Sequence, residues 1–257
     1  MNLPKILISF IFLSFILFSC GGASYPKENL DKSLTDLVKQ ETGLDSEITI
    51  VGNTIYLDIE IEGFLSQDSQ DVSAAFKKMQ TAFSDIMRVV LSSDADINFM
   101  VINAFPPKRN AVFRLIQSID DFKNYYFVRI SKDDYESRTI FEVVSNAKDA
   151  QALIKDKHDM DIDEYVGRMI VAFVQMKFRA NPFLGEMILP TRLTYNQIKK
   201  DSLIVATPLN SIDSETKQIL QTSFLEAGRL FIQKYDTKIK RIQIVSSGNK
   251  TLISIRL

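Results

Sequence analysis

Few residues of this chain have the types and the spacing that catalysis requires. His158 is the only histidine and Cys20 the only cysteine, so a nucleophilic triad that uses imidazole would have to recruit His158 from the polar stretch 155–159. Zinc sites of the usual kind need several cysteine or histidine ligands, and the chain lacks them. The sequence therefore predicts no catalytic, metal-binding or cofactor-binding residues.

Three aspartates have the spacing with which a calcium-binding loop begins. Asp159, Asp161 and Asp163 are each two residues apart, as the first ligands of such a loop are. The pattern stops there, because Glu164 stands where the loop needs glycine and Ile170 where it needs a bidentate glutamate. We interpret Asp161, Asp163 and Glu164 as residues of the first turn of a helix, where acidic side chains complement the helix dipole.

The remaining candidate motifs have simpler structural interpretations. The nine glycines form no phosphate-binding pattern. The segment Pro106–Arg109 could contact an acidic partner or lipid head groups, but prolines and charges are also typical of a solvated hairpin turn. A catalytic pair of carboxylates can lie far apart in sequence, so an enzyme of that kind stays open. We expect four phenylalanines to pack in cores and not to form a ligand box: Phe76, Phe83, Phe224 and Phe231.

Residues 1–19 have the features of a secretory signal peptide. A short start with Lys5 precedes an apolar stretch from Ile6 to Phe18 that only two serines interrupt. The stretch is too short to span the roughly 30 Å hydrocarbon core of a bilayer comfortably. We expect this leader to lie outside the fold.

The end of the leader resembles the bacterial lipobox. In Leu17-Phe18-Ser19-Cys20, an aliphatic residue stands three places before the cysteine and a small one directly before it, while Phe18 replaces the usual small residue. The resemblance implies cleavage between Ser19 and Cys20 and diacylation of the Cys20 sulfur. Gly21 is not the aspartate that retains such proteins at the inner membrane, so the resemblance favours the outer membrane. An uncleaved anchor and an ordinary cleavage nearby are the alternatives.

The composition indicates a packed body without a nucleic-acid partner. Loss of Lys5 with the leader leaves 30 basic residues, from 31 in the whole chain, against 32 acidic residues. This near-neutrality argues against binding to a phosphate backbone. A hydrophobic content of 46%, with only nine glycines and seven prolines, is typical of a globular fold. Residues 20–28 are small and polar enough to form a lipidated tether of roughly 20 Å.

Hydrophobic periodicity predicts an α-β-β-α-β-β unit over residues 29–118. Apolar residues at helical spacing indicate two helices, and strict alternation on both sides of Gly52-Asn53 indicates a tight hairpin. The expected elements are a helix over 29–42, strands over 48–51 and 55–61, a helix over 72–90, and strands over 97–104 and 111–117.

Residues 160–257 are predicted to repeat that order. The stretch Gln80–Phe83 matches Gln221–Phe224 on the two long helices, so the sequence favours an internal duplication. The fold class is therefore α+β, with two related lobes that each place helices on a small, mostly antiparallel sheet. The expected elements are a helix over 162–178, strands over 192–195 and 203–207, a helix over 213–235, and strands over 239–245 and 252–256.

Residues 119–159 have no counterpart in the other copy and form a predicted insert. Tyr125–Ile130 and Thr139–Val144 have the composition of strands, and Lys132–Asp134 lies between them as a turn. We expect an inserted hairpin there. It could carry specificity, extend a sheet or brace the two lobes.

Together these features predict a non-catalytic, lipid-anchored protein of the bacterial cell envelope. It would reach the membrane through the lipid on Cys20 and bind another envelope protein or help to build an assembly. The alternative is a lipid-tethered enzyme or small-ligand carrier that works through carboxylates and backbone groups.

Overall fold

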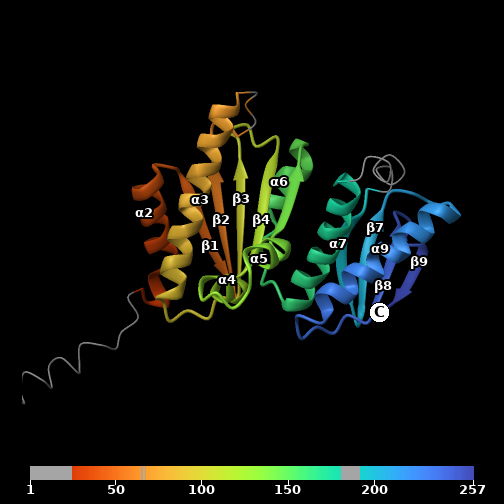
Figure 1. The fold of residues 1–257 in the computed structure, drawn as a ribbon. Helices are drawn as coiled ribbons and strands as arrows, with labels where there is room; N and C mark the ends of the chain where they lie inside the picture. Colours follow the sequence, from red (N-terminus) through yellow and green to blue (C-terminus); the bar gives the residue numbers. More distant parts are fainter. Residues whose placement is uncertain (1–24, 65, 67, 181–191) are drawn as a thin grey trace, which may run out of the picture.

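The computed structural model describes residues 25–64, 66, 68–180 and 192–257, which form two lobes side by side (Figure 1). The predicted leader, the cleavage site at Ser19 and the lipidation site at Cys20 lie outside the described residues. Among the helices that the structure describes, none is both long and apolar enough to cross a membrane.

The first lobe has the predicted α-β-β-α-β-β order. Strands β1 and β2 form an antiparallel hairpin. Helix α3 connects β2 to β3, which pairs directly with β2 in parallel, and β3 and β4 are antiparallel. A short 3-10 helix, η1 (Lys27–Asn29), precedes the first α-helix. The elements are α2 (Leu30–Thr42), β1 (Ser46–Val51), β2 (Thr54–Glu60), α3 (Ser69–Leu91), β3 (Phe99–Phe105) and β4 (Val112–Ser118).

The second lobe repeats the first, element by element. Its sheet has the order β6-β7-β8-β9, with the same sequence of antiparallel, parallel and antiparallel pairs. This agreement confirms the α+β class and the two related lobes. The elements are α7 (Ile162–Ala180), β6 (Thr194–Lys199), β7 (Ser202–Thr207), α9 (Ser214–Ile232), β8 (Arg241–Ser246) and β9 (Thr251–Arg256).

The insert is not the predicted hairpin. Residues 125–130 form no strand, because they contain the end of α4 (Ile119–Tyr126) and the turn that leads into α5 (Lys132–Arg138). Ser118 and Ser131 cap the two helices with their side-chain oxygens, as serine commonly does at a helix start. The second predicted strand exists as β5 (Ile140–Val144), but it pairs with β4 and makes the first sheet five-stranded. Helix α6 (Ala147–Lys155) follows it.

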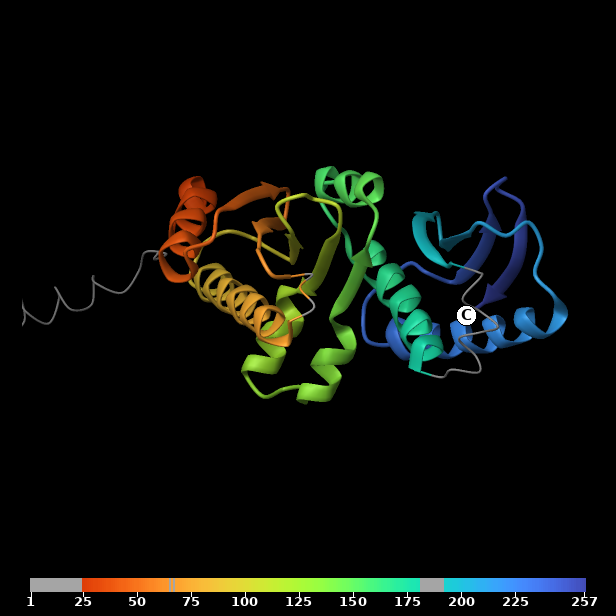
Figure 2. The same ribbon diagram turned by 90° about the horizontal axis from the view of Figure 1, so that it is seen from above.

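The first sheet is covered on both faces, which the sequence did not predict. Leu57 and Ile102 face α2 and α3 and belong to one core. Val101, Ile116 and Ile140 face the opposite way and join the core that α7 and α9 form in the second lobe. Figure 2 shows α3 and α6 on opposite sides of this sheet. The two lobes therefore share a core through α7.

Candidate functional site

The segment between α6 and α7, residues 156–161, joins the two lobes at the start of β2. The hydroxyl of Tyr56 donates a hydrogen bond to the His158 carbonyl at 2.8 Å and accepts one from the His158 N–H at 3.1 Å. Thr54 Oγ1 accepts from the Met160 N–H at 2.9 Å. We call this segment the junction segment, because its backbone is fixed to a strand about a hundred residues earlier in the chain.

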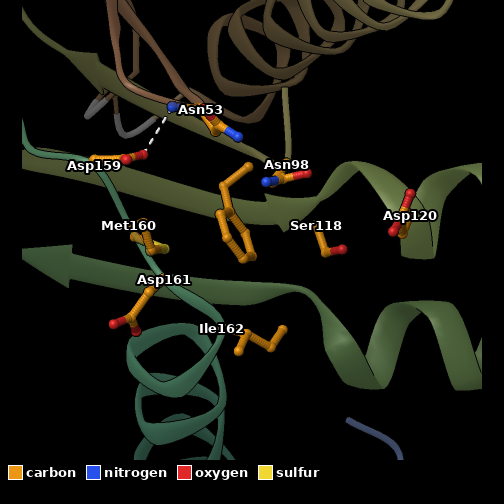
Figure 3. Close-up of a pocket in the computed structure, with 9 residues that line it drawn as sticks. Asn53, Asn98, Ser118, Asp120, Asp159, Met160, Asp161 and Ile162 are labelled. Atoms are coloured by element: carbon orange, nitrogen blue, oxygen red, sulfur yellow. Dashed lines mark hydrogen bonds between the residues drawn. The ribbon is translucent and has the colours of Figure 1, made fainter. Parts of the chain in front are cut away.

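A hollow of about 410 Å³ lies beside the junction segment (Figure 3). Its carboxylates already have partners. Asp120 lies 3.4 Å from the ammonium of Lys123, Asp159 accepts from the Asn53 N–H at 2.8 Å, and Asp161 accepts from the Glu164 N–H at 2.8 Å. The lining consists of Asn53, Asn98, Phe99, Ser118, Asp120, Asp159, Met160, Asp161 and Ile162.

The three aspartates with calcium-loop spacing point to separate partners. Asp159 binds the β1–β2 turn, and Asp161 caps α7 from the position before the helix, while Asp163 and Glu164 lie in the predicted first turn. Asp163 accepts from Thr237 Oγ1 at 2.6 Å and from the Lys238 N–H at 2.7 Å, which attaches α7 to the segment before β8. The described residues contain no group of three or more acidic, histidine or cysteine side chains that could hold a metal ion.

His158 belongs to a chain of ionisable side chains at the interface of the lobes. Its two ring nitrogens lie 3.2 Å from Asp156 Oδ1 and 2.8 Å from Glu164 Oε2. Arg168 continues the chain, because it donates to Glu164 at 2.8 Å and to Glu142 on β5 at 3.0 Å. Burial lowers the pKa of Arg168, but the nearby carboxylates outweigh it and raise the pKa above its ordinary value. The imidazole therefore lies between carboxylates, not beside a nucleophile.

A second row of polar side chains lies under the junction segment on the first sheet. Asn103 donates to Asp58 at 2.6 Å and accepts from Arg114 Nε at 2.8 Å, and Lys157 lies 2.9 Å from the other Asp58 oxygen. Arg114 is 1% exposed and also donates to the Leu153 carbonyl of α6. Burial lowers the pKa of Arg114. The row fixes α6 and the junction segment to the sheet.

A third cluster joins the insert to the end of α9. Arg138 donates to Asp121 at 2.7 Å and to Asp134 at 2.5 Å, and Lys234 pairs with Asp134. The hydroxyl of Tyr235 donates to Asp121. Burial and the charge of Asp121 raise the pKa of Tyr235, so this phenol stays protonated and acts as a donor.

The other residues that the sequence singled out serve packing or turns. Phe224 and Phe231 are 0% exposed, which confirms them as core residues, and Phe83 packs against Phe122 at the edge of its core. Phe76 is 41% exposed but packs on Phe64 and Phe113, so it lies at the edge of the first core and not inside it. Pro106–Arg109 forms the turn between β3 and β4, with the Arg109 guanidinium over the Phe105 ring at 4.7 Å.

Comparisons with known proteins identify no relative of this chain. No protein-family description, no curated protein and no solved structure matches the chain.

Proposed function

We propose that this protein is a lipid-anchored binding or assembly module of the bacterial cell envelope, tethered through Cys20. The observation that carries the proposal is the lipobox-like stretch Leu17-Phe18-Ser19-Cys20 behind an apolar leader. Diacylation would provide two acyl chains, and two chains are the number that stable membrane anchoring requires. The outer membrane is the favoured location, because Gly21 is not an aspartate.

The geometry of the junction supports a binding role over a catalytic one. Asp159 accepts from the β1–β2 turn, His158 lies beside Glu164, and Asp161 accepts from the Glu164 N–H at the start of α7. A catalytic base has to lie within hydrogen-bond reach of a substrate proton, and these groups serve contacts within the protein instead. The scaffold instead presents the outer surfaces of two related lobes that share a core.

Metabolic labelling with an alkyne fatty acid tests the anchor. Wild type and Ser19→Ala, which keeps a small residue before the cysteine, should both incorporate the label and fractionate with membranes. Cys20→Ala should do neither, and an inhibitor of lipoprotein signal peptidase should leave the wild-type leader uncleaved. Labelling of Cys20→Ala, or an intact Met1 on the mature protein in mass spectrometry, would overturn the assignment.

Cross-linking in intact cells tests the binding role. A stoichiometric envelope protein cross-linked to wild type supports the proposal. Recovery of a small molecule in the hollow at Asn98, with no protein partner, would favour the lipid-tethered carrier instead.

A further inference from the structure

One face of the second sheet carries no helix of the described part of the chain, and we call it the open face. Of the described helices, α7 and α9 pack on this sheet and lie on the same face, and Figure 2 shows no other described helix over the opposite one. The strand registers define which side chains point to the open face, because residues paired across strands share a face. Leu203 and Ile242 belong to the core below, so their neighbours Ser202 and Arg241 belong to the open face.

A row of three cations crosses this open face. Lys199 pairs with Ser202, Ser202 with Arg241, and Arg241 with Arg256 in the strand registers. The row therefore extends over four adjacent strands, or roughly 15 Å. Lys199, Arg241 and Arg256 are all exposed, and none of them lies within ion-pair distance of a carboxylate in the described part of the chain. We call these three residues the cationic row.

The surroundings of the cationic row strengthen its positive charge. Lys200 and Lys240 are exposed at the same end of the strands. The acidic neighbour, Asp201, accepts a hydrogen bond from Ser202 Oγ at 3.2 Å. Five cations against two carboxylates, those of Asp201 and of the C-terminal Leu257, make this corner the kind of surface that attracts anions.

The cationic row lies at the same end of the molecule as the start of the described chain. Tyr25 forms a bridge with Ser93, just before β3, and β3 and β7 both start at the lower edge in Figure 1, where the C-terminus also lies. Five residues of extended chain span at most about 18 Å, so a lipid on Cys20 would hold Tyr25 within that distance of its attachment point. This step rests on the proposed function.

We infer that the cationic row docks on the anionic phospholipid head groups of the membrane that carries the anchor, with the open face of the second sheet toward the bilayer. Guanidinium groups form paired hydrogen bonds with phosphate oxygens, and basic side chains near a surface are attracted by anionic lipid. The registers place no aromatic side chain on the open face, so its described part lacks the stacking platform that single-stranded nucleic acids need. A lipid surface is the polyanion that the observations favour.

Two single-cysteine probes test this orientation in the full-length lipidated chain. With the Cys20 sulfur acylated, Ser254→Cys on the open face and Thr222→Cys on the exposed side of α9 each supply the only free thiol. Each variant carries a fluorescent thiol label and is reconstituted into phosphatidylcholine vesicles, with or without phosphatidylglycerol, that contain a head-group quencher lipid. We expect quenching at position 254 to exceed quenching at 222 in anionic vesicles only, and salt to abolish the difference.

Charge reversal identifies the residues responsible. The triple variant Lys199→Glu, Arg241→Glu, Arg256→Glu should remove the quenching difference. The fraction of protein docked through the cationic row on anionic vesicles should fall by about 100-fold. A matched triple reversal elsewhere makes the same change in net charge and should leave the difference intact. Its positions are exposed and on other surfaces: Lys77, Lys148 and Lys217. Both triple variants should melt like wild type, because every changed side chain is exposed.

The outcomes separate the anchor from the docking surface. A chain that floats with both kinds of vesicle but is quenched equally at 254 and 222 overturns the docking inference and leaves the anchor standing. A chain that floats with neither overturns both. If an oligonucleotide binds the cationic row more tightly than anionic vesicles do, the surface belongs to nucleic acid and the inference is wrong.

Discussion

The carboxylate of Asp159 occupies the space that a β-carbon on Gly52 would need. Its Cγ lies 2.1 Å from the position of that missing atom. Gly52 also has a φ of 58°, in the left-handed region that the turn between β1 and β2 requires. The glycine therefore has two roles. It adopts the backbone conformation of the hairpin turn, and its missing β-carbon leaves room for the Asp159 side chain of the junction segment.

Gly52→Ala should destabilise the fold by about 2–3 kcal/mol, because the methyl group both strains the turn and displaces Asp159. Gly43 at the end of α2 is the matched control. Its φ is 69°, but a β-carbon there meets nothing within 4 Å, so Gly43→Ala should cost only about 1 kcal/mol. Urea unfolding measures both free energies. Equal losses would show that the contact with Asp159 contributes nothing.

Arg114→Met should destabilise the fold by about 3 kcal/mol, because it leaves the Asn103 and Leu153 oxygens without their buried donor. Arg229→Met on the exposed side of α9 should change the stability by less than about 0.5 kcal/mol. Thermal and urea unfolding measure the two variants. A small effect at Arg114 would mean that water replaces the guanidinium and that the polar row of Asp58, Asn103 and Arg114 is not needed for stability.

Acid should loosen the contact between the insert and α9. Burial raises the pKa of Asp134, but hydrogen bonds from Arg138 and Lys234 outweigh it, and the pKa is lowered overall. A lowered folded pKa contributes stability that is present above the unfolded value of about 4 and is lost as the pH falls through the folded value. The protection of the α5 amides, which is the exchange rate relative to the intrinsic rate at the same pH, should therefore fall below about pH 4. Asp134→Asn should exchange faster than wild type at pH 7 and respond less to acid.

Asp85→Asn should stabilise the protein at pH 7 by about 1 kcal/mol. Asp85 is 7% exposed, one of its oxygens has no hydrogen-bond partner, and burial raises its pKa. A raised folded pKa contributes stability below the unfolded value of about 4, and this stability is lost as the pH rises through the folded value. The advantage of the variant should therefore shrink on acidification. Asp36→Asn, exposed on α2, is the control and should have little effect at either pH.

Hydrophobic periodicity predicted the elements of both lobes, because each of these helices and strands buries apolar residues at a regular spacing. Ile55, Leu57 and Ile59 alternate toward α2 and α3, and no distant residue is needed to recognise that pattern. The strand predicted at Tyr125–Ile130 failed for the opposite reason. Its aromatic and β-branched residues favour a strand locally, but Tyr125 stacks on Tyr135 at 4.6 Å between two serine-capped helices.

The junction could not be predicted, because its partners are far apart in the chain. Nothing local to Asp159 indicates that it caps the turn at Asn53, and nothing local to Arg114 indicates a covered second face on the first sheet. Asp58, Asn103 and Arg114 are polar residues at positions that alternation assigns to solvent. The signal available was their cross-strand alignment, which appears only once the register of β2, β3 and β4 is known.

The position of α7 sets an order of events during synthesis. Val101, Ile116 and Ile140 are buried against a helix that the ribosome makes after the whole first sheet. Domains generally fold as they emerge, from the N-terminal end. Under the proposed export, the chain would also cross the membrane N-terminal end first, so the first lobe would keep one apolar face exposed to water until residues 162–180 had followed it.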